Sequence, residues 1–288
     1  MLEAALAGKL EQLRLNLAER GASLVAYSGG VDSTLLLRVA HEVLGDRVTA
    51  VLAVSPSLAS SDRQAAHRLA DEIGARLVEV ETNEFDNPDY LRNASDRCYH
   101  CKSELFEVLQ RLGRTMGGPS LLYGAITDDL GDERPGMKAA HEAGVAAPLI
   151  EAGLSKVEVR ALSRFFGLSS WNAPGRPCLS SRVPHGIEVT PERLAAIEAA
   201  EAVLLAEGFR EFRVRYHLDV ARLEVSEAEW DRFREHDLRE RVTMGVRAAG
   251  FRFVSLDLAG FRSGSLSRAA GGSQAAASRP ASDLPIVR

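Results

Sequence analysis

Three cysteines are the most reactive side chains of this chain, and their number and spacing restrict their chemistry. Cys98 and Cys101 form a C-x-x-C pair in "SDRCYHCKSELF", and Cys178 lies in "RPCLSSR". Three thiols cannot all pair with one another, and the first residues do not resemble an export signal, so we expect a reducing, cytoplasmic compartment and no structural disulfide. The residues alone leave three possibilities open: a redox pair, a zinc site with His100 or His185 as fourth ligand, and a [4Fe–4S] cluster with one iron lacking a protein ligand.

A glycine-rich segment, "AYSGGVDSTLLL", is the second stretch that could do chemistry. Ser28, Gly29 and Gly30 suit a tight turn after an apolar run, and a helix is expected to begin near Asp32 and Ser33. Paired glycines let backbone N–H groups approach an anion, and a helix N-terminus adds unsatisfied donors and a positive dipole. The segment has neither the Walker A lysine nor the G-x-G-x-x-G spacing, so it predicts a phosphate site of another kind, with a ligand-free tight turn as the alternative.

The first half of the chain alternates apolar runs with segments of helical periodicity. The runs cover residues 22–28, 48–55, 75–82 and 120–126. The segments that separate the first three runs each end in a glycine suited to a helix C-terminus. This alternation predicts an α/β fold with a parallel sheet covered on both faces. Asp128 follows the fourth run, at the carboxyl edge where open parallel sheets bind ligands, and Asp129 is its neighbour.

The second half of the chain predicts a smaller α+β domain. A helix is expected over 190–208, with Thr190 as N-cap, and after it two strands, a helix over 229–250 and a third strand. A segment rich in proline and glycine, 172–186, is the predicted junction. We therefore place a phosphate-binding α/β domain at 1–175 and the smaller domain at 176–265. The small and polar residues 266–288 are predicted to be a disordered tail.

Several charged residues of the second half are candidates for a functional role. They are Arg182, Arg213, Arg215, Arg262, Glu198, Glu201 and Glu224. Arg213 and Arg215 alternate along a predicted strand and therefore share one face. Glu198 and Glu201 lie on one helical face, and Glu224 interrupts an apolar strand. By pattern alone, such residues are typical of solvated surfaces.

Composition limits the class of protein. The chain has 288 residues, of which 45% are hydrophobic, enough to bury one or two cores. It has no apolar run of about 18 residues, so no membrane span is predicted. The formal net charge of -5 argues against a nucleic-acid surface, which needs clustered Lys and Arg.

The glycine-rich segment resembles the PP-loop of ATP pyrophosphatases, which cleave ATP between its α and β phosphates to adenylate a substrate oxygen. Further segments are "RCYHCKSELF", "ITDD", "DDLGDERPGMKAAHEAGV", "LSKVEVRALSRFFGL" and "PCLSSRVPHG". Together they resemble one family, the ATP-dependent sulfur transferases that build the nickel-pincer nucleotide of lactate racemase (LarE type). The resemblance extends over almost the whole chain. It implies that a carboxylate of pyridinium-3,5-biscarboxylic acid mononucleotide is adenylated and that sulfur then displaces AMP to give a thiocarboxylate.

The resemblance also implies roles for individual residues. The predicted ATP site comprises Ser28, Gly29, Gly30, Asp32 and Ser33, to which we add Asp128 from its place after the fourth run. In that site Asp32 would help to hold Mg²⁺. The predicted substrate site comprises Arg182, Arg213, Arg215 and Arg262. Cys178 matches the sulfur-bearing cysteine of the family, and Glu201 and Glu224 are candidate catalytic carboxylates.

Two mechanisms of sulfur supply occur in this family. In one, a lone cysteine gives up its own sulfur and becomes dehydroalanine. In the other, a C-x-x-C pair accompanies it, and three thiolates hold a [4Fe–4S] cluster that relays exogenous sulfide. Because Cys98, Cys101 and Cys178 are all present, the resemblance favours the cluster as cofactor beside ATP and Mg²⁺. Sacrificial use of Cys178 is the alternative.

Other functions remain possible for a PP-loop protein with cysteines. They are a tRNA thiolase, an ammonia-using synthetase, and an ATP-responsive binding protein without chemistry. The net charge of -5 and the lack of a second C-x-x-C speak against the tRNA enzyme. The expected partners are the nucleotide substrate, a sulfide source and further copies of the chain in a homo-oligomer, without nucleic acid or membrane.

Overall fold

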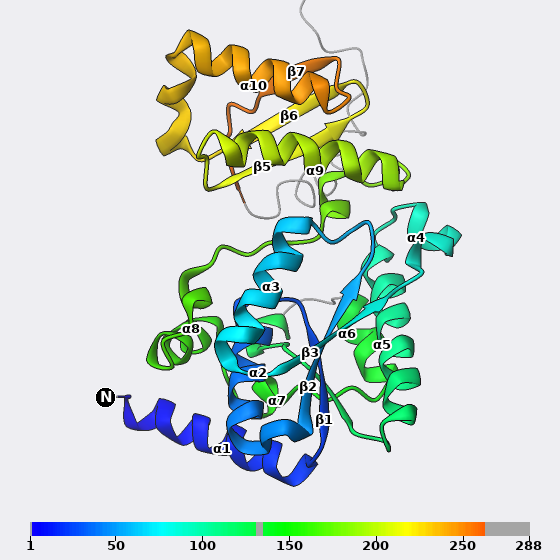
Figure 1. Ribbon diagram of the computed structural model, residues 1–288, viewed down its shortest axis with the longest axis vertical. Coiled ribbons are helices and arrows are strands. Elements are labelled where there is room, and N and C mark those ends of the chain that lie inside the picture. The colour runs from blue at the N-terminus through cyan, green and yellow to red at the C-terminus, as the bar shows by residue number, and fades with distance from the viewer. Residues whose placement is uncertain (1, 131–134, 263–288) are drawn as a thin grey trace, which may run out of the picture. The chain divides into compact units, whose positions relative to one another are not determined.

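The structure is a computed structural model that describes residues 2–130 and 135–262 (Figure 1). The chain divides into two compact units. The first comprises the residues up to Ser181 together with Val189–Leu194, and the second comprises Arg182–Glu188 and the residues from Ala195 onward. The first boundary, between Ser181 and Arg182, falls within the segment rich in proline and glycine that the sequence predicts as a junction, and the other two lie beyond it. The predicted tail, 266–288, lies outside the described residues.

A parallel sheet forms the centre of the first unit. Its strands are β1 (Ser23–Tyr27), β2 (Val48–Val54), β3 (Arg76–Glu81) and β4 (Ser120–Tyr123). They lie in the order β3-β2-β1-β4, and each neighbouring pair is parallel. The predicted α/β class and the four predicted strands are confirmed.

Helices cover both faces of this sheet, as the sequence predicts (Figure 1). The helices of the first unit are α1 (Ala4–Arg20), α2 (Val31–Leu44), α3 (Ser60–Ile73), α4 (Pro88–Leu91), α5 (Arg97–Thr115), α6 (Pro135–Glu142), α7 (Pro148–Glu151) and α8 (Lys156–Phe165). Side chains of β1 alternate between two buried clusters because successive residues of a strand point to opposite faces. Val25 and Tyr27 join the cluster of α1 and α2, whereas Leu24 and Ala26 join the cluster of α5 and α6.

Short 3-10 helices connect several of these elements. They are η1 (Gly45–Arg47), η2 (Glu84–Asp86), η3 (Thr127–Asp129), η4 (Ser169–Asn172), η5 (Leu179–Arg182) and, in the second unit, η6 (Glu227–Arg234). Among the described helices, none is long and apolar enough to cross a membrane.

The second unit is built on a smaller mixed sheet. Its elements are α9 (Pro191–Ala206), β5 (Phe212–His217), β6 (Val220–Val225), α10 (His236–Ala248) and β7 (Phe253–Leu256). β6 pairs antiparallel with β5 and parallel with β7. The predicted strand–strand–helix–strand order is confirmed, and so is the N-cap, because the Arg193 N–H donates to Thr190 Oγ1 at 3.3 Å.

The predicted helix over 229–250 is wrong at its start. The chain forms the 3-10 helix η6 up to Arg234, and α10 begins only at His236. Between them Glu235 has extended backbone angles, with φ -69° and ψ 121°. Such angles end one helix and suit the N-cap of the next, so the apparent single helical pattern is split in two.

Candidate active site

The phosphate loop, Ser28 to Gly30, joins β1 to α2. Gly29 has φ +69°, and a Cβ atom there would lie 3.0 Å from Cα of Ala66, so both the backbone angle and the space require glycine. Ser33 closes the loop: its Oγ accepts the Ser28 N–H at 3.3 Å and donates to the Gly30 carbonyl at 3.1 Å. The first N–H groups of α2 have no partners within the helix, so the loop presents donors to an anion.

Gly124, which follows β4, contacts this loop and was missed by sequence reasoning. A Cβ atom at this position would lie 2.8 Å from the backbone nitrogen of Ser33 and 2.9 Å from its Cα. The strand therefore ends at Tyr123, before the predicted end at 126, because the backbone of residue 124 lies against the start of α2. A glycine inside an apolar run is the signal for such a close approach.

Asp32 and Lys156 form an ion pair beside the phosphate loop. Lys156 Nζ lies 2.9 Å from Oδ1 and 2.7 Å from Oδ2 of Asp32. Burial raises the pKa of Asp32, whereas the hydrogen bond and charge of Lys156 lower it, with a smaller contribution from Arg160. Both cations lie on α8, so this helix supplies the positive charge that the loop itself lacks. Sequence reasoning missed Lys156 because it is 124 positions from Asp32.

The two aspartates after β4 have different surroundings. Asp128, the predicted ATP ligand, is exposed, and its Oδ2 accepts the backbone N–H of Lys156 at 2.8 Å, at the start of α8. Its neighbour Asp129 lines the cavity described next, and its Oδ2 accepts the Ile126 N–H at 3.0 Å. A role of Asp128 in ATP binding stays a prediction.

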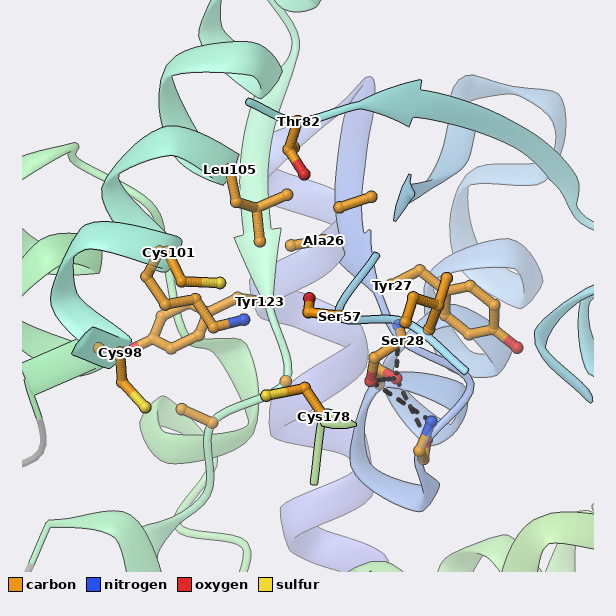
Figure 2. Close-up of a pocket in the computed structure, with 18 of the residues that line it drawn as sticks. Ala26, Tyr27, Ser28, Ser57, Thr82, Cys98, Cys101, Leu105, Tyr123 and Cys178 are labelled. Atoms are coloured by element: carbon orange, nitrogen blue, oxygen red, sulfur yellow. Dashed lines mark hydrogen bonds between the residues drawn. The ribbon is translucent and has the colours of Figure 1, made fainter. Parts of the chain in front are cut away.

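A cavity of about 530 Å³ opens at the carboxyl ends of the strands in the first unit. The phosphate loop and all three cysteines line it. Figure 2 shows Tyr27 and Ser28 on one side, Cys98 and Cys101 on the other, and Cys178 between them. The structure thus brings the predicted phosphate site and the predicted sulfur chemistry into one space.

The three thiols of this cavity differ in exposure. Cys98 and Cys178 are exposed, and Cys101 is half-buried. Burial raises the pKa of the Cys101 thiol to about 12; Lys102 opposes this rise, and the Cys178 thiol adds to it. Cys98 and Cys101 lie in the first turns of α5. Both line the same cavity as Cys178.

Metal binding depends on how these donor groups are arranged. In the part of the chain that the structure describes, no group of three or more His, Cys, Asp or Glu residues is arranged to hold a metal ion. His100, a predicted fourth zinc ligand, lies 3.5 Å from Asp96 instead. Three thiols that share one cavity do match the donor set of a [4Fe–4S] cluster, which binds thiolates and tolerates an iron without a protein ligand. The cluster itself stays a prediction.

Glu84 is a further cavity residue that sequence reasoning missed. Its side chain is buried, and its Oε1 accepts hydrogen bonds from Ser55 Oγ at 2.6 Å and Ser57 Oγ at 3.3 Å. Its Oε2 is also buried and has no hydrogen-bond partner among the described residues. No local pattern distinguishes this glutamate from the other acidic residues around β3.

The predicted carboxylates and arginines of the second unit form buried ion pairs. Arg215 is 2% exposed, and its Nε donates to Oε2 of the fully buried Glu224 at 2.9 Å. Arg182 Nε donates to Oε1 of Glu201 at 2.8 Å. A solvated strand face, which pattern alone suggests for Arg213 and Arg215, is therefore wrong, because both side chains are buried, with Phe261 against Arg213 and Glu224 against Arg215.

Arg213 has a different environment from Arg215. It is 5% exposed and its guanidinium lies 4.8 Å from the ring centroid of Phe261, but no carboxylate or other hydrogen-bond acceptor among the described residues pairs with it. Burial, together with the charges of the nearby Arg215 and Arg182, lowers the pKa of Arg213 to about 10, although Glu224 and Glu201 oppose this shift. A buried cation that pairs directly with no carboxylate is suited to an anionic partner, and the role of Arg213 in substrate binding stays a prediction. Arg262 is exposed.

Comparison with known proteins agrees with this geometry. A family model described as NAD synthase matches residues 7–105. An uncharacterized protein of Synechocystis is 43% identical over 263 residues, which cover 91% of this chain and 98% of that protein. The pyridinium-3,5-bisthiocarboxylic acid mononucleotide synthase of Lactiplantibacillus plantarum is 41% identical over 242 residues, covering 83% of this chain and 87% of that enzyme.

This chain belongs to the family of pyridinium-3,5-bisthiocarboxylic acid mononucleotide synthases. The predicted resemblance is thereby confirmed. More distant relatives include a component of the glutamine-hydrolyzing GMP synthase of Pyrococcus horikoshii, which is 29% identical over 217 residues, 68% of this chain and 67% of that protein. The residues that match the NAD synthase model, 7–105, include the phosphate loop, which places this chain among the PP-loop proteins.

For a member of this synthase family, the structure separates the predicted site residues into two groups. Those of the first unit, the loop residues and the cysteines, share one cavity. Those of the second unit, Arg182, Arg213, Arg215, Glu201 and Glu224, form one charged cluster. Individual roles in catalysis and binding stay predictions.

Proposed function

We propose that this protein is an ATP-dependent sulfur transferase that adenylates a carboxylate of pyridinium-3,5-biscarboxylic acid mononucleotide and converts it to a thiocarboxylate. The observation that carries the proposal is the single cavity that the phosphate loop and all three cysteines line. The site of ATP activation and the sulfur donor must lie close together, because the acyl-adenylate has to react with sulfur before water hydrolyses it. The relative from Lactiplantibacillus plantarum is a pyridinium-3,5-bisthiocarboxylic acid mononucleotide synthase, which supports the choice of substrate.

The loop end of the cavity is suited to ATP. The N–H groups at the start of α2 can bind the departing pyrophosphate, and Gly29 and Gly124 keep the space beside them clear. Asp32 is the carboxylate that can hold Mg²⁺, which when bound supplies charge to the phosphates. Lys156, which contacts Asp32 at 2.7 Å, is a cation within reach of the same region. A substrate carboxylate oxygen then attacks the α-phosphorus, and pyrophosphate leaves.

The thiol end of the cavity is suited to sulfur delivery. Cys98, Cys101 and Cys178 would hold the [4Fe–4S] cluster, and when bound such a cluster supplies sulfide. Sulfur forms a bond to the acyl carbon, the bond from that carbon to the AMP oxygen breaks, and AMP leaves with the electron pair. In the alternative mechanism the Cys178 sulfur makes this attack and forms a thioester; a base then removes the Cα proton of residue 178, its Cβ–S bond breaks, and the thiocarboxylate leaves with the sulfur while dehydroalanine remains. Three thiols in one cavity favour the cluster, because the sacrificial mechanism needs Cys178 alone.

The arginine cluster of the second unit is suited to the phosphate of the mononucleotide. Arg215 and Arg182 are held by Glu224 and Glu201, which fixes their orientation. Arg213 brings a guanidinium that lacks a carboxylate partner among the described residues, and charge-assisted bonds from such a group to phosphate are strong.

The test is a reaction with anaerobically purified protein, MgATP, the biscarboxylate mononucleotide and sulfide. We expect AMP, pyrophosphate and a product in which sulfur has replaced oxygen. A parallel reaction with ammonia in place of sulfide tests the amide-forming activity that the GMP synthase relatives suggest. Nucleotide binding without pyrophosphate, or an amide as the sole product, would contradict the proposal. The cytoplasmic location and the homo-oligomer stay predictions.

A further inference from the structure

We propose that Tyr90 and Arg97 are positioning residues for Cys178, because they hold the neighbouring Ser180 and so fix the thiol in the cavity. This inference rests on the proposed function, in which the three thiols act in one place. We call the group formed by Tyr90, Asn93 and Arg97 the Ser180 clamp.

The contacts of the clamp involve both the side chain and the backbone of Ser180. Its Oγ lies 2.7 Å from the Tyr90 hydroxyl, and its carbonyl accepts a hydrogen bond from Arg97 Nη1 at 2.8 Å. Arg97 Nη1 also donates to Oδ1 of Asn93 at 2.5 Å. Ser180 and Asn93 are fully buried, and Tyr90 is 1% exposed. These bonds are therefore shielded from water, and each is costly to lose.

The clamp residues are themselves held in one conformation. Asn93 has φ +55°, a left-handed backbone angle that asparagine tolerates better than most residues. In this conformation the side-chain amide oxygen of Asn93 accepts the hydrogen bond from Arg97. Burial raises the pKa of Tyr90, and the Cys178 thiol adds to this rise, so the hydroxyl stays protonated. A phenol that keeps its proton remains a hydrogen-bond donor.

A second set of contacts holds the same segment from the chain after β2. The Leu179 N–H donates to the Ser57 carbonyl at 2.9 Å. Ser57 in turn is bound through its hydroxyl to Glu84 at 3.3 Å. Cys178 is thus an exposed residue directly before two buried ones, Leu179 and Ser180, that contact different elements of the first unit.

Arg97 gives the clamp its importance for sulfur chemistry. It is the first residue of α5 and directly precedes Cys98. One side chain therefore connects the start of the helix that carries Cys98 and Cys101 to the segment that carries Cys178. Residues 173–178 have no regular secondary structure, so tertiary contacts such as those of the Ser180 clamp and of Ser57 decide where this thiol lies. A displacement of about 1 Å at a reacting group is enough to cost about 100-fold in rate.

The experiment compares Tyr90→Phe, Ser180→Ala and the double variant with the wild type and with Tyr99→Phe. Tyr99 is a matched control, because it lies on α5 and its hydroxyl donates to Glu142 at 2.7 Å without contacting the Cys178 segment. One measurement is the ratio of thiocarboxylate formed to pyrophosphate released. The other is cross-linking of Cys178 to Cys98 or Cys101 in iron-free protein with a short dithiol-reactive reagent, mapped by peptide mass spectrometry.

We expect Tyr90→Phe and Ser180→Ala to lower the product ratio about tenfold or more and to reduce the cross-link, while KM for ATP stays unchanged. The double variant should lose no more than either single one, since all three remove the same hydrogen bond. Variants that match Tyr99→Phe in both measurements would overturn the proposal. If Tyr90→Phe fails to fold, Ser180→Ala carries the test. A wild type that makes no thiocarboxylate refutes the proposed function alone, because the cross-link still tests the clamp.

Discussion

Arg213→Met is expected to stabilise the free protein while removing its response to the mononucleotide. The guanidinium of Arg213 is buried beside two other arginines, and no carboxylate among the described residues pairs with it. Its pKa is lowered in the folded state, so the folded protein disfavours the charged form. At every pH below about 10 the charge therefore costs stability, and this cost is fully present at neutral pH.

The size of the effect follows from the lowered pKa. At about 1.4 kcal/mol for each pKa unit, the difference between 12.5 and about 10 corresponds to about 3 kcal/mol. Removing the cation also removes its contact with the Phe261 ring, worth about 1 kcal/mol. We therefore expect Arg213→Met to raise the free energy of unfolding by about 1 to 2 kcal/mol.

Equilibrium unfolding in urea at neutral pH measures this change, and Arg215→Met is the matched control. Removing Arg215 takes one cation from the fully buried Glu224, which should lower the free energy of unfolding by about 3 kcal/mol. The changes in the free energy of unfolding should thus have opposite signs for Arg213→Met and Arg215→Met, two positions apart on one strand. This difference distinguishes a cation that binds a ligand from one that stabilises the fold. Repeating the series with saturating mononucleotide should stabilise the wild type by about 3 kcal/mol at 100 times Kd and leave Arg213→Met unchanged.

The reasoning would be refuted if Arg213→Met were clearly less stable than the wild type. It would also be refuted if that variant were stabilised by the mononucleotide as strongly as the wild type. Either result would mean that groups of the protein itself neutralise the charge of Arg213, so that this charge is not reserved for an anionic ligand.

Three further predictions concern the first unit. Lys156→Met should reduce pyrophosphate release at least about 100-fold, the usual scale for removing a charge that stabilises a transition state, with ATP turnover as the measurement. Gly124→Ala should reduce the same rate strongly, since its Cβ would lie 2.8 Å from the Ser33 nitrogen, whereas Gly113→Ala, with no neighbour nearer than 3.7 Å, should not. Cys98→Ala should lose iron and catalysis together if three thiolates hold a cluster; one turnover per chain by iron-free variant protein would instead support sacrifice of Cys178.

Local patterns determined most of the fold and the nature of the chemistry. The strands β1 to β4 are short apolar runs, and the phosphate loop is a glycine turn between a strand and a helix, so each depends on residues close together in the chain. The C-x-x-C pair is local as well, because one helical turn carries both thiols to the same side of α5. The break before α10 was missed, since helical periodicity continues across a residue whose backbone is extended.

Tertiary structure alone decided which distant groups meet. Lys156 reaches Asp32 across 124 positions, and Cys178 enters the cavity of Cys98 and Cys101 through buried contacts of Ser180. The burial of Arg213 was likewise hidden, because alternating arginines on a strand look the same whether water or the chain after β7 covers them. Side-chain type and spacing specify what a group can do chemically. Its pKa, its partner and its exposure depend on what the folded chain packs against it.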